Sequence, residues 1–296
     1  MLKTVFNPMR SVLLIFFLPA LTVLINGCTT IEIKEKDAFD AHRTITPAEF
    51  DIPGYRLYQH TIETEDGEEL DSWFIQHEDA QANVIFMGGN GFLMVKSRYL
   101  IETYSSLPVN LLLFDYRGYG MSSGEPSIAG IKKDAQAAYN FVDQHEEAGK
   151  LPVYIHGHSM GSLLAGWLAG RESVDGYVLE SPISSTDDWT SGLVPRLFRP
   201  LVRFDVAESI REHDNLDRVA RISHPLLLIG SENDPITPFR MAESLYDASV
   251  SEQKKLINIS NGGHNDLPQF SEYRDALEAF YLEHAGLEQP EYTAEY

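Results

Sequence analysis

Cysteine and basic side chains are both scarce in this sequence. Its 296 residues include one cysteine, Cys28, so no disulfide can form within the chain and the fold must be held together by its core. Only 23 residues are Lys or Arg against 44 Asp or Glu, which gives a formal net charge of −21 at pH 7. This acidity argues against binding of nucleic acids or other polyanions. It also argues against electrostatic binding to anionic lipid, so we expect any membrane attachment to be covalent.

The sequence also lacks the usual patterns of metal and nucleotide sites. It has no H-E-x-x-H segment, and the pair His156 and His158 alone does not predict a metal site. The glycines of residues 88–91 have neither G-x-G-x-x-G spacing nor a following Gly-Lys-Ser/Thr, so they do not favour a phosphate-binding loop. We therefore expect neither a metal ion nor a cofactor.

The first 28 residues have the pattern of an export signal. Lys3 and Arg10 precede an apolar stretch, residues 11–25, which is shorter than the roughly 20 residues that span a membrane. Gly27 and Cys28 follow, and the arrangement resembles a bacterial lipoprotein signal. The resemblance implies a signal peptide over residues 1–27, lipidation of Cys28 and, because Thr29 follows, sorting to the outer membrane on its periplasmic side. An uncleaved N-terminal anchor and a buried core cysteine are the alternatives.

The most informative segment is Gly-His-Ser-Met-Gly at residues 157–161. An apolar run, residues 151–156, precedes it, and a run of small and apolar helix-forming residues, 162–169, follows it. This order predicts a strand, a sharp turn and a helix with Ser159 at the apex of the turn. Glycines two residues either side of the serine let the strand and the helix approach closely. A chance match in a glycine-rich loop is the alternative reading of these five residues.

A serine nucleophile needs a base to take its proton and an acid to orient that base. Asp234 comes directly after the apolar strand-like run 225–230, and His264 lies in a glycine-rich loop after the run 255–259. The chain order serine, acid, histidine makes Asp234 and His264 the candidate partners of Ser159. An acid in a turn is common in any protein, so Glu180 and Asp266 remain the alternatives to Asp234.

Stabilising a negatively charged oxygen requires two backbone N–H groups. Met160, the residue after the candidate nucleophile, is expected to supply one of them. The second is expected from Asn90, in the glycine-rich loop after the strand-like run 83–87. These residues complete a candidate site for acyl transfer.

With these segments in place, the chain resembles the α/β-hydrolase superfamily. Residues 114–127 are similar to the D-Y-R-G-Y-G-x-S-x-G-x-P-S loop of its depalmitoylase-like branch and that branch's bacterial relatives, and residues 180–185 resemble the start of that branch's cap region. The resemblance implies a mostly parallel central sheet with helices on both faces, a small helical cap, and hydrolysis of acyl esters or thioesters such as palmitoyl groups. One departure is Gly88, where the family usually has histidine.

After the predicted signal peptide, the chain divides into a tether, a domain with an inserted cap, and a tail. We expect a tether over residues 28–54, an α/β-hydrolase domain over 55–288 that starts with a hairpin, a cap inserted at about 182–224, and a tail over 289–296. The cap is rich in arginine and in large apolar residues. Four of these are candidates for the acyl-binding surface, or alternatively pack the cap onto the sheet: Trp189, Leu193, Leu197 and Phe198.

We expect a serine hydrolase that acts on a small-molecule or lipid-like acyl ester. An aminopeptidase-like serine peptidase on the same fold is the first alternative, although the sequence shows no charged pocket for a peptide terminus. A non-catalytic envelope lipoprotein is the second alternative. A chain that had lost catalysis has little reason to keep serine, acid, histidine and both oxyanion loops in order.

Overall fold

The computed structural model describes residues 29–42, 54–195, 197–211 and 214–286. The predicted signal peptide, Cys28 and the predicted tail over 289–296 lie outside the described residues. Within the described part of the chain, no helix is long and apolar enough to cross a membrane.

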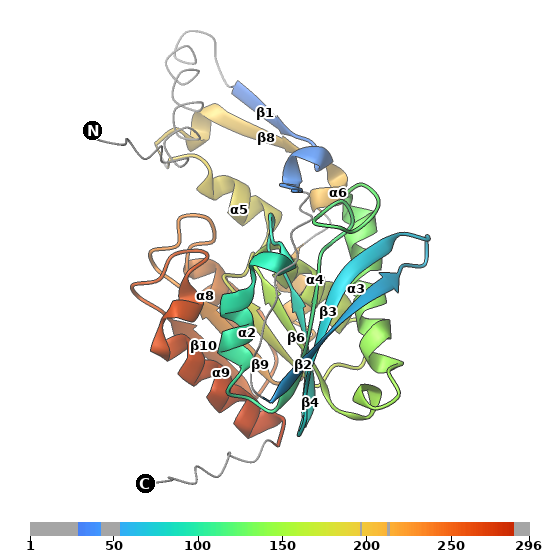
Figure 1. The fold of residues 1–296 in the computed structure, drawn as a ribbon. Helices are drawn as coiled ribbons and strands as arrows, with labels where there is room; N and C mark the ends of the chain where they lie inside the picture. Colours follow the sequence, from blue (N-terminus) through green and yellow to red (C-terminus); the bar gives the residue numbers. More distant parts are fainter. Residues whose placement is uncertain (1–28, 43–53, 196, 212–213, 287–296) are drawn as a thin grey trace, which may run out of the picture.

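An eight-stranded sheet forms the centre of the molecule (Figure 1). The predicted hairpin opens it as an antiparallel pair, and its second strand pairs antiparallel with β5. All remaining pairings are parallel. The spatial order is β10-β9-β7-β6-β4-β5-β3-β2. The strands, in chain order, are β2 (Tyr55–Glu63), β3 (Glu69–His77), β4 (Ala82–Met87), β5 (Val109–Phe114), β6 (Val153–His158), β7 (Gly176–Glu180), β9 (Leu226–Gly230) and β10 (Lys254–Asn258).

Helices cover both faces of this sheet because its central strands are apolar on both sides. In β4, Ile85 and Met87 face one core cluster while Val84 and Phe86 face the other, as the two-residue period of a strand requires. The fold class predicted from the sequence is confirmed. Helices α3 (Ile128–Asp143), α4 (Met160–Ala169) and α8 (Arg240–Ala248) contribute to the first cluster, and α2 (Arg98–Tyr104) and α9 (Ser271–His284) to the second.

The cap contains a strand as well as short helices. It runs from α5 (Thr186–Gly192) through the 3-10 turn η5 (Arg199–Leu201) and strand β8 (Val202–Val206) to α6 (Glu208–Arg211) and α7 (Asn215–Val219). β8 pairs in parallel with β1 (Thr29–Ile33), which lies outside the predicted hydrolase domain. The two strands lie side by side above α5 in Figure 1.

Residues 29–42, here called the N-terminal strap, therefore pack against the domain. The prediction of a tether over residues 28–54 does not hold for them. Ile33 contacts the core cluster and its carbonyl oxygen accepts a hydrogen bond from Ala207 N at 3.0 Å. The Glu35 carboxylate accepts from Ile128 N at 2.7 Å and from the Ser209 hydroxyl at 2.8 Å. Alternating apolar residues in a short polar segment become a strand only when a partner strand, here in the cap, is available.

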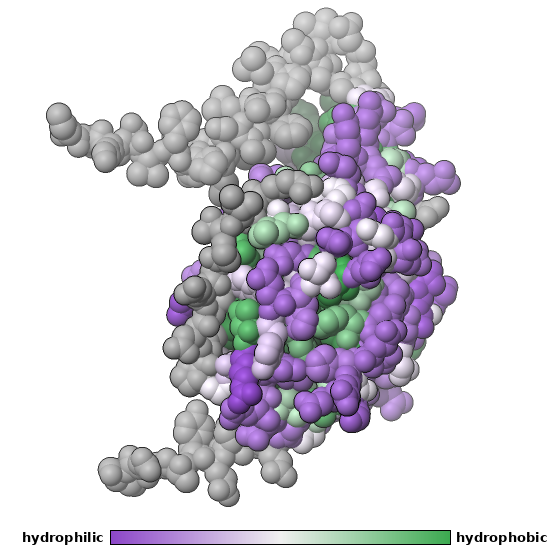
Figure 2. All heavy atoms as spheres, turned by 45° about the vertical axis from the view of Figure 1, so that its right-hand side comes forward, coloured by the Kyte–Doolittle hydropathy of each residue, from purple (hydrophilic) through white to green (hydrophobic). Residues whose placement is uncertain are grey.

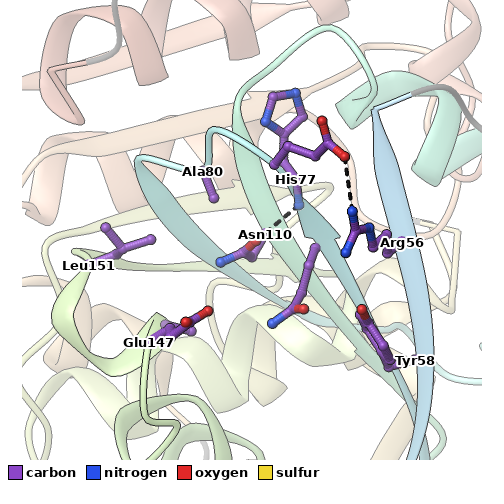
Figure 3. Close-up of a pocket in the computed structure, with 10 residues that line it drawn as sticks. Arg56, Tyr58, His77, Ala80, Asn110, Glu147 and Leu151 are labelled. Atoms are coloured by element: carbon purple, nitrogen blue, oxygen red, sulfur yellow. Dashed lines mark hydrogen bonds and ion pairs between the residues drawn. The ribbon is translucent and has the colours of Figure 1, made fainter.

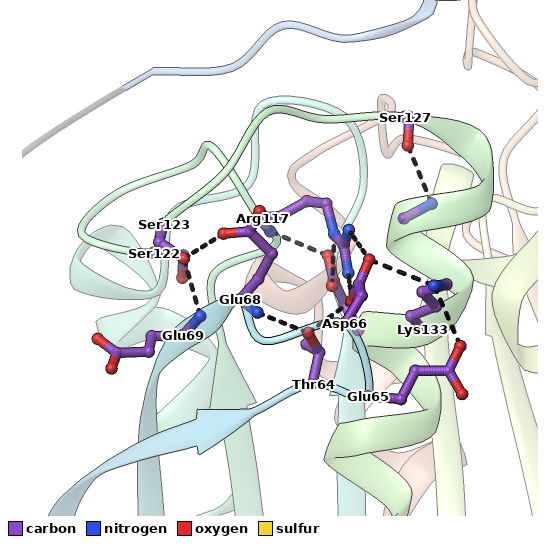
Figure 4. Close-up of polar contacts among 12 residues, drawn as sticks. Thr64, Glu65, Asp66, Glu68, Glu69, Arg117, Ser122, Ser123, Ser127 and Lys133 are labelled. Atoms are coloured by element: carbon purple, nitrogen blue, oxygen red, sulfur yellow. Dashed lines mark hydrogen bonds and ion pairs between the residues drawn. The ribbon is translucent and has the colours of Figure 1, made fainter.

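The loop after β5 is held by a partly buried ion-pair network (Figure 4). Arg117 Nε donates to Asp134 at 2.8 Å, and its terminal nitrogens donate to Asp66 at 2.9 and 3.0 Å. Lys133 Nζ adds a contact to Asp66 at 3.3 Å. Arg117 hydrogen bonds hold the pKa of Asp66 well below its usual range, whereas burial raises the pKa of Asp134 to about 6 despite the same arginine. The network fixes the family-like loop to the first hairpin and to α3.

Hydrophilic side chains cover most of the face that Figure 2 shows. This agrees with the excess of acidic residues in the sequence. Hydrophobic residues appear on this face only as smaller patches between the polar ones.

Candidate active site

Ser159 lies in a sharp turn between β6 and α4. Its backbone has φ 51° and ψ −115°, in the left-handed region that non-glycine residues rarely adopt. The flanking glycines are required by close backbone approach. A Cβ at Gly157 would lie 2.6 Å from the carbonyl oxygen of Gly161, and a Cβ at Gly161 would lie 1.9 Å from that of Met87. The predicted strand, turn and helix are thus present around Ser159.

The structure brings Ser159, His264 and Asp234 together in one hydrogen-bonded chain. The Ser159 hydroxyl and His264 Nε2 are 3.0 Å apart, and His264 Nδ1 and Asp234 Oδ2 are 2.7 Å apart. These three residues come from the ends of β6, β10 and β9, at the carboxyl edge of the parallel sheet. The geometry is that of a nucleophile, its base and the acid that orients the base.

Asp234 is fixed by three further hydrogen bonds. Its Oδ1 accepts from Ile236 N at 2.8 Å and from Thr237 N at 2.9 Å, and its Oδ2 accepts from the Thr237 hydroxyl at 2.8 Å. Burial alone would raise the pKa of Asp234, but the contact with His264 and the backbone N–H groups outweigh it and hold this pKa below its usual range. The carboxylate is therefore ionised and oriented toward the imidazole at neutral pH.

The alternative acids have other partners. Glu180 is buried and accepts from the Tyr273 hydroxyl at 2.7 Å and contacts His156 Nε2 at 3.0 Å. Asp266 accepts from Gly263 N.

Of the competing histidines, His158 contributes indirectly, because its Nε2 lies 3.0 Å from the carbonyl oxygen of His264 and so supports the loop that carries the base.

Asn90 and Met160 line the same cavity as Ser159 and His264. The side chain of Asn90 is held on both sides: its Oδ1 accepts from the Tyr119 hydroxyl at 2.9 Å and from Asp40 N of the strap at 2.6 Å. The loop that should supply the second oxyanion donor is therefore fixed by the strap and by the loop after β5.

The glycine at position 88 has a local explanation. A Cβ there would lie 2.2 Å from the ring of Phe92, whose aromatic group packs against Phe86 with ring centroids 5.2 Å apart. The Tyr116 hydroxyl donates to the carbonyl oxygen of Gly88 at 3.1 Å. Phe92 and Tyr116 thus brace this loop in a chain that lacks the usual histidine.

The cavity beside Ser159 and His264, the candidate catalytic cavity, has a volume of about 290 Å³ and a mainly apolar lining. Trp189 lines it, as predicted for the acyl-binding surface. Leu193, Leu197 and Phe198 are not among its described lining residues and are exposed, so the structure does not place these three side chains at the cavity. They follow the helix that carries Trp189, which ends at Gly192. The apolar lining from the described residues consists of Ala38, Ile128, Ile131, Met160, Leu163, Leu164, Ile183, Trp189, Ile210 and Ile236.

Sequence reasoning missed the contribution of the strap to this cavity. Asp37 and Ala38, from the 3-10 turn η2 (Glu35–Ala38), line it together with Ile236 from the loop that carries Asp234. Asp37 is the one carboxylate among the described lining residues, and no lysine or arginine is among them. For Ile236, its position two residues after Asp234 could have indicated a place at the cavity. For Asp37 and Ala38 the sequence gave no such signal, because η2 belongs to no recognisable motif.

A second, larger cavity of about 480 Å³ lies beside the β2–β3 hairpin (Figure 3). Two pairs of its polar groups contact each other: Arg56 with Glu78 at 3.2 Å, and His77 N with Asn110 Oδ1 at 3.1 Å. Its lining has no serine or cysteine beside a base, so of these two cavities the smaller one has the residue types that acyl transfer requires. No group of three or more metal-ligating side chains occurs within the described ranges.

Comparison with known proteins agrees with this fold. A family model described as the alpha/beta hydrolase fold matches residues 88–207. An uncharacterized protein of Mycobacterium tuberculosis is 30% identical over 233 residues, which is 77% of this chain and 80% of that one. The uncharacterized protein YfhR of Escherichia coli O157:H7 is 31% identical over 230 residues, covering 73% and 78%. The chain therefore belongs to the α/β-hydrolase family.

Two further similarities concern proteins with a described activity. The lysophosphatidylserine lipase ABHD12 of Danio rerio is 33% identical over 171 residues, covering 54% of this chain and 44% of that one. The esterase Pf2001 of Pyrococcus furiosus has the same fold with a TM-score of 0.68 and 20% identity, covering 84% and 98%. The second similarity shows the fold alone, and the depalmitoylase-like branch stays a prediction.

Proposed function

We propose that this protein is a serine hydrolase that cleaves carboxylic ester or thioester bonds through an acyl-enzyme intermediate. The observation that carries the proposal is the hydrogen-bonded chain from Ser159 through His264 to Asp234, with the serine at a strained turn. Such a chain raises the nucleophilicity of a hydroxyl that is otherwise weak at neutral pH.

The mechanism follows from these contacts. His264 Nε2 takes the proton of Ser159 as the hydroxyl attacks the acyl carbon, and Asp234 stabilises the resulting imidazolium. The backbone N–H groups of Met160 and Asn90 are the proposed donors to the oxyanion. His264 then protonates the leaving alcohol or thiol, and a water molecule that it activates hydrolyses the acyl-enzyme.

The lining of the cavity favours a neutral, aliphatic acyl group. Its apolar residues match hydrocarbon, and no described lysine or arginine lines it to pair with a phosphate or carboxylate. Asp37 would repel an anionic group placed nearby. The lack of a cation in the described lining also disfavours a peptidase that recognises a peptide carboxylate. The aminopeptidase-like alternative, whose substrate carries a cationic amine, is decided by the assay below.

The test is kcat/KM on p-nitrophenyl esters from acetate to palmitate, measured for the wild type, Ser159→Ala and Ser244→Ala. Ser244 is an exposed serine on α8 whose hydroxyl bonds only within its helix, so it serves as the matched control. We expect hydrolysis to be lost in Ser159→Ala alone. Wild-type protein inactive on every ester would favour the peptidase or the non-catalytic lipoprotein.

The proposed location is the bacterial envelope, with Cys28 lipidated and the domain held at the outer membrane. The support is the sequence of residues 1–28 alone. Metabolic labelling with an alkyne fatty acid should mark the wild type and not Cys28→Ser. Equal labelling of both would refute lipidation at this cysteine.

A further inference from the structure

The edge of the cap carries an unusual concentration of exposed apolar side chains. Nine large hydrophobic residues in the described part of the chain are exposed, and four of them fall within residues 193–201. This segment together with the first half of β8, residues 193–204, is here called the cap edge. The four exposed side chains are Leu193 (53% exposed), Leu197 (81%), Phe198 (46%) and Leu201 (38%).

The cap edge is also basic in a strongly acidic protein. Residues 193–204 contain three arginines and no acidic residue, although the whole chain has a net charge of −21. Of these arginines, Arg199 and Arg203 are exposed. Apolar side chains beside arginines are the composition of segments that lie in a lipid interface. The argument from whole-chain charge against contact with anionic lipid therefore does not hold for this surface.

The position of the strap links the cap edge to the N-terminal part of the chain. The parallel register of β1 and β8 places Thr29 opposite Val202, directly after Leu201. The residue before Thr29 is Cys28, the predicted lipidation site, and the apolar stretch 11–25 lies further upstream. If residues 11–25 are removed, the lipid is expected on Cys28, and if they are retained, they are expected to associate with lipid themselves. In both cases the lipid-associated part of the chain joins the fold at the cap edge.

The cap edge is also close to the catalytic cavity. Trp189 of α5 lines the cavity, and Leu193, the residue that caps the same helix, is exposed. Four residues of α-helix span about 6 Å. A surface bound at Leu193 would therefore lie about one helical turn from a cavity residue.

We propose that the cap edge is a membrane-docking surface. Leu193, Leu197 and Phe198 enter the boundary between lipid headgroups and acyl chains, and Arg199 and Arg203 contact anionic lipid headgroups. The N-terminal segment holds the protein at the membrane, and the cap edge orients it so that the catalytic cavity faces the lipid from which an acyl ester would come.

The decisive experiment measures docking without catalysis. The full chain with Ser159→Ala is reconstituted into vesicles of phosphatidylethanolamine and phosphatidylglycerol, with an environment-sensitive fluorophore attached through Leu197→Cys. Val250→Cys, at a residue 61% exposed and outside the cap edge, is the matched control. Protein with no introduced cysteine reports any labelling of Cys28.

We expect the fluorophore at residue 197 to be blue-shifted and quenched severalfold by doxyl-labelled lipid, and the fluorophore at residue 250 to remain in water. Equal quenching at the two positions, or none at residue 197, would overturn the proposal. A blue-shifted fluorophore that doxyl lipid does not quench would mean that a second copy covers the cap edge, which would overturn it as well.

A kinetic experiment tests orientation and rests on the proposed function. In the full chain, Leu197→Asp combined with Phe198→Asp should raise KM for a long-chain ester in vesicles at least tenfold. It should leave kcat/KM for soluble p-nitrophenyl acetate within twofold, and Val250→Asp should change neither. Equal losses on both substrates would assign these side chains to stability and overturn the orienting role. Wild type inactive on both would refute the proposed function, while the fluorescence result would still decide docking.

Discussion

Replacement of Asp234 by asparagine tests the site most sharply, because the structure dictates how the new amide would lie. Asp234 Oδ1 accepts two backbone N–H groups, from Ile236 and Thr237. An amide NH₂ cannot accept them, so the oxygen of asparagine must occupy this position and the NH₂ must take the place of Oδ2. That NH₂ then faces His264 Nδ1, 2.7 Å away in the wild type.

The consequence is a change of tautomer at His264. A donor facing Nδ1 requires that nitrogen to accept, so the ring proton moves to Nε2, the atom that should take the proton of Ser159. We expect kcat to fall about 10⁴-fold, which corresponds to about 5 kcal/mol of lost transition-state stabilisation. Activity should not disappear, because the oxyanion donors and substrate binding are retained.

The assay is steady-state hydrolysis of the best p-nitrophenyl ester, with thermal unfolding to verify that the variant is folded. Asp266→Asn is the matched control, since Asp266 lies in the same loop as His264 and contacts backbone rather than the imidazole. It should retain activity within a few fold. Asp234→Asn within tenfold of the wild type would refute the assignment, and a large loss in Glu180→Gln would then identify the acid.

Three further predictions concern the cavity, the buried network and a buried acid. Trp189→Ala should shift the preferred acyl chain length, whereas Leu197→Ala should leave the chain-length preference for soluble esters unchanged. The p-nitrophenyl ester series measures both variants. The same chain-length preference in both variants would refute the assigned lining. Arg117→Ala should lower the free energy of unfolding in urea by roughly 3 kcal/mol because Asp134 loses its buried partner, whereas loss of the exposed Arg98 pair should cost less than about 1 kcal/mol. Burial raises the pKa of Asp115 from 3.8 to about 7, so the unfolded state releases this proton first and stability should fall as pH rises from about 4 to about 7, by roughly 4 kcal/mol at most. Asp115→Asn should remove this slope in urea titrations at pH 5 and 8, and an unchanged slope would contradict it.

The fold and the hydrogen-bonded residues could be predicted because their signals are local. Ser159 needs glycines on both sides, and Asp234 and His264 each follow an apolar run, so a few neighbouring residues show where each belongs. The apolar strands also had to be covered on both faces, whatever the details of the helices. These features depend on backbone sterics and burial, and glycine positions and runs of apolar residues indicate both.

The cavity wall could not be predicted because its contacts join distant segments. Asp37 lies at the cavity in a strap that pairs through β1 with β8, about 170 residues away, and neither strand is recognisable alone. Leu197 has the same hydrophobicity as a lining residue, yet it lies beyond the end of α5 and is 81% exposed. Hydrophobicity reports that a side chain prefers to leave water, but it does not distinguish the core, a substrate cavity and a lipid surface.

The N-terminal strap connects the cap, the cavity and the loop that carries Asn90. The same fourteen residues pair with the cap through β1, line the cavity through Asp37 and Ala38, and fix Asn90 through the backbone of Asp40. A force that displaced β8 at the membrane would therefore act on the oxyanion loop through a continuous run of backbone. Because that run begins beside the cap edge, the segment expected to anchor the protein is also the one that connects its docking surface to its candidate catalytic centre.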